Sequence, residues 1–63
     1  MTKITSSMAK SIANQHISQE GCYAGTPQDT SFEYIFPILN ENEKQVGEIY
    51  VSYGGKVIGG CGG

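Results

Sequence analysis

The spacing of apolar residues changes once along this chain, from a helical period to a period of two, and this change limits the fold more than any other feature. From Thr2 to Glu20 there is no Gly or Pro. Apolar or partly apolar side chains recur there at intervals of three and four, which places them on one face of a helix. They are Met8, Ala9, Ile12, Ala13, His16 and Ile17. With Thr2 or Thr5 as N-cap and Gly21 as the residue that ends it, this segment is predicted to be one amphipathic helix.

Two later segments alternate with a period of two, which is typical of strands. In 31–39, one face carries Phe32, Tyr34, Phe36 and Ile38, and the other carries Glu33, Ile35, Pro37 and Leu39. In 45–53, Ile49, Val51 and Tyr53 alternate with Glu48, Tyr50 and Ser52. Because Pro37 has no N–H to donate, the first of these strands is expected at a sheet edge, or its regular pairing is expected to stop there.

The remaining segments have turn chemistry. Residues 22–30, with Gly25, Pro27 and Asp29, are expected to connect the helix to the sheet. Gly54 and Gly55 can both take the positive φ of a two-residue type I′ hairpin, which would set Val51 opposite Ile58 on a short third strand from 56 to 58 or 59.

A chain of 63 residues has room for one domain only. We therefore predict an α+β fold in which an N-terminal helix packs on a small antiparallel sheet of about three strands. The single domain is expected to cover residues 1–58. Residues 59–63, of which four are Gly, are expected to form a flexible tail.

The formal charge of −2 and the scattered positions of the four lysines argue against nucleic acid as a partner. No apolar run approaches the length of a membrane span, and residues 1–13 lack the continuous apolar stretch of a secretory signal. We therefore expect no membrane partner and a cytoplasmic location, with a mature form that has lost its signal as the alternative. Cys22 and Cys61 are expected to be free thiols, with a disulfide between them as the alternative.

Each candidate for catalytic or metal chemistry has a simpler explanation. His16 and Cys22 could form a nucleophilic pair, but Cys22 follows the C-terminal end of the helix, where the dipole disfavours a thiolate. Adding Cys61 would give three metal ligands, yet none of them has the close spacing of a zinc knuckle. The acidic residues Glu33, Glu41, Glu43 and Glu48 are expected to be a solvated face, with an acidic surface for a basic partner as the alternative. We therefore predict no enzyme, no catalytic residues, no cofactor and no metal.

The order of the segments resembles a known kind of module. A helix over 8–17, then Glu48-Ile49-Tyr50-Val51 and Gly55-Lys56-Val57-Ile58, is similar to the helix-plus-sheet modules of the PepSY-like and protease-propeptide-like families. Such modules inhibit or chaperone peptidases, so the resemblance implies a peptidase-like partner. It carries over no functional residues.

The strand patterns leave one sheet face without a covering helix, and this face is the predicted partner-binding surface. Its residues are Glu33, Ile35, Leu39, Glu48 and Tyr50. The resulting hypothesis is a small non-enzymatic protein-binding module of the inhibitor or immunity type, with a homodimer as an alternative use of the same face. The competing hypothesis is a carrier or modified peptide substrate that acts through the Gly- and Cys-containing tail.

Overall fold

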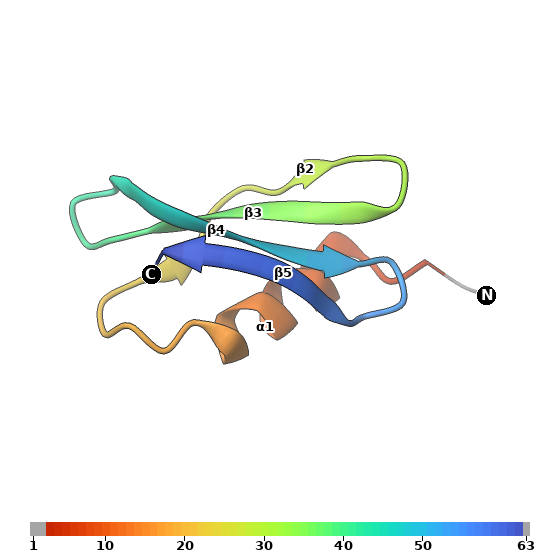
Figure 1. Ribbon diagram of the computed structural model, residues 1–63, viewed down its shortest axis with the longest axis horizontal. Coiled ribbons are helices and arrows are strands. Elements are labelled where there is room, and N and C mark those ends of the chain that lie inside the picture. Colours follow the sequence, from red (N-terminus) through yellow and green to blue (C-terminus); the bar gives the residue numbers. More distant parts are fainter. Residues whose placement is uncertain (1–2, 63) are drawn as a thin grey trace.

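One helix packs on one face of a five-stranded antiparallel sheet (Figure 1). The computed structural model describes the backbone of residues 3–62 and the side chains of residues 3–60. The elements follow in the order α1 (Ser6–His16), β1 (Tyr23–Ala24), β2 (Gln28–Asp29), β3 (Glu33–Leu39), β4 (Gln45–Ser52) and β5 (Val57–Gly62). The α+β class is confirmed, but the expectation of about three strands is wrong, because β1 and β2 also pair with β3. Within residues 3–62 no helix is long and apolar enough to cross a membrane.

The helix is shorter than its sequence pattern indicated. The side-chain oxygen of Thr5 accepts a hydrogen bond from the Met8 N–H at 3.2 Å and so acts as N-cap. The chain leaves the helix after His16, where Ile17 takes an extended conformation and packs against the core. Gly21 does have a positive φ of 80°, but it lies in the turn beyond and does not end the helix.

The contact face of α1 is also narrower than predicted. Ala9 and Ala13 are completely buried, whereas Met8 is 54% exposed and His16 is exposed. The methyl side chains of Ala9 and Ala13 let the helix lie close to the sheet, because larger groups there would hold the two layers apart.

The core is built from the sheet face that α1 covers. Along β3, Tyr34, Phe36 and Ile38 are buried while the residues between them are only half-buried, as the alternation predicted. Ile49 and Val51 of β4 complete this face. Phe32, which the same alternation placed in the core, precedes β3 and is 70% exposed.

Both long hairpins use a three-residue loop with the same hydrogen bonds. In the β3–β4 hairpin, Asn40 N–H donates to the Lys44 carbonyl and Glu43 N–H to the Asn40 carbonyl; in the β4–β5 hairpin, Ser52, Lys56 and Gly55 repeat this arrangement. The third loop residue has the positive φ, 61° at Glu43 and 91° at Gly55.

The predicted type I′ turn at Gly54-Gly55 is therefore wrong. The Ser52 hydroxyl accepts from the Lys56 N–H and favours the longer loop. Val51 consequently faces Val57 instead of Ile58, and the register shifts beside Val51 so that Tyr50 faces Gly59.

Strand β5 continues to Gly62, beyond the end expected at residue 58 or 59. Glycine supplies the backbone groups that a ladder requires, and Gly60 sits where an added Cβ would lie 2.9 Å from the Glu48 carbonyl oxygen. Four residues of the segment that we expected to be a tail, 59–62, thus lie within a strand paired with β4, and Gly63 lies outside the described residues.

Candidate functional site

The face of the sheet opposite α1 is the candidate site, and we call it the open face. All five predicted partner-binding residues lie on it and are half-buried: Glu33, Ile35, Leu39, Glu48 and Tyr50. The register places Ile35 directly opposite Tyr50. The Tyr50 hydroxyl donates to Glu48 Oε1 at 3.3 Å. The structure therefore brings three of the five together near the centre of the face.

Glu33 and Leu39 occupy the two ends of β3. They are six residue steps apart along an extended strand, or about 20 Å at roughly 3.3 Å per step. A single small ligand cannot contact both, so the five residues mark a broad surface with a smaller centre.

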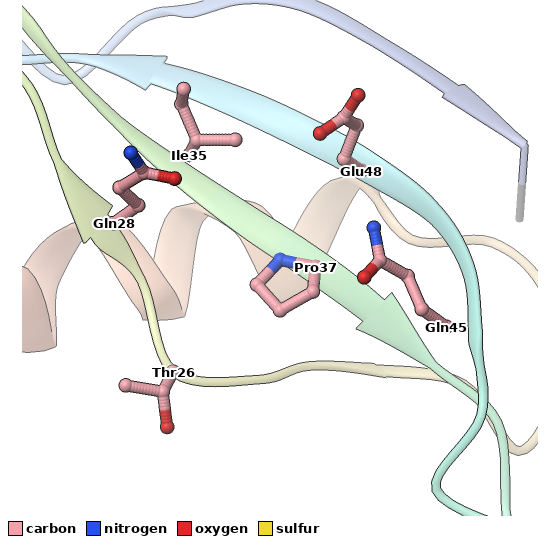
Figure 2. A pocket seen from close by; sticks show the side chains of 6 residues that line it. All are labelled: Thr26, Gln28, Ile35, Pro37, Gln45 and Glu48. Atoms are coloured by element: carbon pink, nitrogen blue, oxygen red, sulfur yellow. The ribbon is translucent and has the colours of Figure 1, made fainter.

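That centre is a hollow of about 200 Å³. It is lined by Thr26, Gln28, Ile35, Pro37, Gln45 and Glu48. Figure 2 shows Pro37 on β3 in the middle, with Thr26 and Gln28 on one side and Gln45 and Glu48 on the other, and α1 behind the sheet.

Pro37 explains why the hollow forms where it does. The Pro37 carbonyl accepts from the Gly25 N–H at 2.8 Å, so its backbone polar groups point toward β1 and β2 and away from β4. With no N–H at Pro37, the ladder on that side is interrupted, and residues 25–27 cross the gap between β1 and β2. Of the two expectations for Pro37, the interruption of pairing is observed and the edge position is not, because β4 pairs along the other side of β3.

A β-bulge shapes the opposite side of the hollow. Ile38 faces Gly47 and Leu39 faces Gln45, which leaves Val46 as an extra residue in β4. A bulge of this kind bends its strand and changes the direction of neighbouring side chains. Gln45 thereby lines the hollow together with Glu48.

Four of the six residues around the hollow were not predicted from the sequence to bind a partner: Thr26, Gln28, Pro37 and Gln45. Pro37 was placed on the correct face but was considered only as an interruption. Gln28 belongs to a two-residue strand, which is too short to show a period.

The clearest pKa shifts lie at the other side of the molecule, where Lys3, Asp29 and Tyr53 meet. The Tyr53 hydroxyl donates to the Asp29 carboxylate and to the Thr30 carbonyl, and Lys3 Nζ lies 3.0 Å from Asp29 Oδ2. The hydrogen bond from Tyr53, and then that from Lys3, lowers the pKa of Asp29. The same contacts with Asp29 raise the pKa of Lys3 and of Tyr53. This cluster joins the segment before α1 to β2 and so has a structural role.

The structure describes the side chains of two of the three residues first considered for catalysis or metal binding. His16 is exposed, with Nδ1 at 3.0 Å from the Ile12 carbonyl oxygen. Cys22 is half-buried against the core and carries a free thiol. The side chain of Cys61 lies outside the described part of the chain. Among the residues that are described, no three His, Cys, Asp or Glu side chains cluster as a metal site.

Comparison of the sequence and the structure with known proteins found no matching family model, no matching curated protein and no matching solved structure.

Proposed function

We propose that this chain is a small non-enzymatic protein-binding module, of the inhibitor or immunity type, which occupies a macromolecular partner with its open face. The observation that carries the proposal is the division of the sheet into two faces. α1 packs on one face, and the other presents half-buried apolar side chains around a hollow.

The composition of the open face supports contact with another protein. Ile35 and Tyr50 form a central apolar pair, with Pro37 beside it and polar groups such as Gln28 and Glu48 around it. An apolar and aromatic centre with a polar rim is the usual arrangement of an interface. Tyr combines a large apolar area with a hydroxyl and little rotamer entropy, which makes Tyr50 a suitable anchor.

The resemblance to PepSY-like and protease-propeptide-like modules supports a peptidase as the partner, since such modules inhibit or chaperone peptidases. A second copy of the chain is the competing occupant of the same face.

The test compares variants of the two faces for capture of partners from host extract, with quantification by mass spectrometry. Tyr50→Ala and Ile35→Ser change the open face, and Gln15→Ala changes an exposed position of α1. We expect the two open-face variants to lose a partner that the Gln15 variant retains at wild-type level. Affinity measured with the purified partner should fall by about tenfold or more for Tyr50→Ala, as for a central interface Tyr.

Full partner affinity in both open-face variants would refute the proposal. Sedimentation at several concentrations identifies the homodimer: a dimer that Tyr50→Ala dissociates would replace the external partner with a second copy of the chain.

A further inference from the structure

We propose that the hollow on the open face binds an arginine side chain of the partner. This inference rests on the proposed function, because the hollow belongs to the same face, and it adds the chemistry by which the partner is recognised.

The polar groups around the hollow are well supplied with acceptors. Among the described residues that line it, Glu48 alone is charged, and Gln28 and Gln45 each contribute a carboxamide oxygen. An arginine side chain carries five N–H donors, no acceptor and a permanent positive charge. Its donors therefore match one carboxylate with amide oxygens on two sides better than any other natural side chain does.

The apolar part of the hollow fits the rest of an arginine. Pro37 and Ile35 lie between the polar groups and offer apolar surface there (Figure 2). A guanidinium plane is less strongly hydrated than an ammonium, and the methylene stem below it packs on apolar surface. The hollow of about 200 Å³ holds several times the roughly 30 Å³ of one water, so a side chain of this length has room.

The Glu48 carboxylate is already positioned for such a contact. The Tyr50 hydroxyl donates to its Oε1 at 3.3 Å, which restricts the side chain without neutralising it. The one ion pair among the described residues joins Lys3 to Asp29, so none of the described lysines forms an ion pair with Glu48. An incoming arginine supplies the missing positive charge, and the net charge of −2 favours its approach.

The test is a titration of ¹⁵N-labelled protein, followed by NMR, with the tripeptide acetyl-Gly-Arg-Gly-amide. The comparison peptides carry lysine or the neutral isostere citrulline in place of arginine. We expect saturable shifts centred on the backbone amides of Gln28, Ile35 and Glu48, an affinity about threefold lower for the lysine peptide, and no localised shifts with citrulline. Equal shifts with citrulline, or arginine shifts spread over all exposed carboxylates, would overturn the arginine site, as would the absence of localised shifts.

A charge-matched pair of variants sharpens the result. Glu48→Gln and Glu41→Gln remove the same charge, but Glu48 lines the hollow whereas Glu41 is exposed in the loop between β3 and β4. Affinity for the arginine peptide should fall about fivefold or more in Glu48→Gln and stay near the wild-type value in Glu41→Gln. Equal losses in the two variants would mean general attraction to an acidic surface and would contradict a built site.

The purified partner separates this inference from the function on which it rests. If Ile35→Ser abolishes partner binding but Glu48→Gln leaves it unchanged, the open face binds the partner and the arginine site is refuted. If the peptide binds at the hollow while partner binding survives Tyr50→Ala and Ile35→Ser, the proposed function fails and the arginine site stands.

Discussion

The two faces of β3 differ in burial although they alternate along one strand. Tyr34, Phe36 and Ile38 are 5%, 0% and 5% exposed beneath α1, whereas Ile35 and Pro37 on the open face are only half-buried. Both sets are apolar, so the difference comes from what covers them and not from their composition. One face of the strand therefore packs in the core and stabilises the fold, and the other is available for contact with a partner.

Truncation of one residue on each face tests this division most strongly. Phe36→Ala removes a fully buried ring and should cost about 3–5 kcal/mol, enough to unfold much of so small a domain. Ile35→Ala should cost about 1 kcal/mol or less, because its side chain is already partly solvated. Thermal and urea unfolding measure both, and equal losses would contradict the assignment of the two faces.

The helix side of the covered face can be tested by overpacking. Ala13 is fully buried between α1 and the sheet, so Ala13→Leu should destabilise the protein by about 1–3 kcal/mol. Gln15→Leu places the same side chain at an exposed position of the helix and should change the free energy of unfolding by about 0.5 kcal/mol or less. A stabilising Ala13→Leu would mean that the two layers are not closely packed there.

A smaller, pH-dependent effect is expected at the rim of the covered face. The hydrogen bonds from Tyr53 and Lys3 lower the pKa of Asp29 below its ordinary value of 3.8, so the ionised carboxylate favours the folded state. This contribution is complete above that value and is lost as the pH falls through the lowered pKa. The stability difference between wild type and Asp29→Asn should therefore be present at neutral pH and shrink in stronger acid. Unfolding curves from pH 7 to pH 2 measure it, with Glu41→Gln as the charge-matched control that should show no such trend.

The last prediction compares the two edges of the sheet. Cys22 immediately precedes β1, and Cys61 lies in β5, with β3 and β4 between these strands. Strands lie about 4.8 Å apart, so β1 and β5 are separated by three spacings, or roughly 14 Å. Disulfides join Cα atoms only about 4.4–6.8 Å apart, so we expect both cysteines to remain thiols. A free-thiol assay on denatured protein, protected from air and reductant throughout, should find two reactive groups. A monomer with no free thiol would show that the two edges of the sheet come together.

Much of this division could be predicted from the sequence, because long alternating segments report burial directly. The pattern of 31–39 assigned Phe36 to the core and Ile35 to the open face, and the structure agrees. Phe32 was assigned to the core wrongly, because the alternation in the sequence starts before the strand itself begins at Glu33. The end of the helix was wrong for a related reason: Ile17 continues the helical spacing, yet it reaches the core from an extended backbone.

The parts that were missed depend on short-range hydrogen bonds, which apolar spacing does not report. The length of the β4–β5 loop follows from the Ser52 hydroxyl, and two glycines in sequence could not distinguish it from a tighter turn. The hollow depends on the pairing of β2 and on the bulge at Val46. No pattern in the sequence therefore indicated that Gln28 and Gln45 lie beside it.

The order of the elements along the chain has a consequence for folding. The helix precedes the strands that it packs on, and the buried residues beneath it include Ile49 and Val51, more than thirty residues later. Tyr53 then fixes the segment before the helix by accepting a hydrogen bond from the Ile4 N–H at 3.0 Å. An isolated helix of 11 residues is marginal in water. The helix therefore depends for its stability on strands that follow it in the sequence, so its formation is coupled to that of the β3–β4 pair.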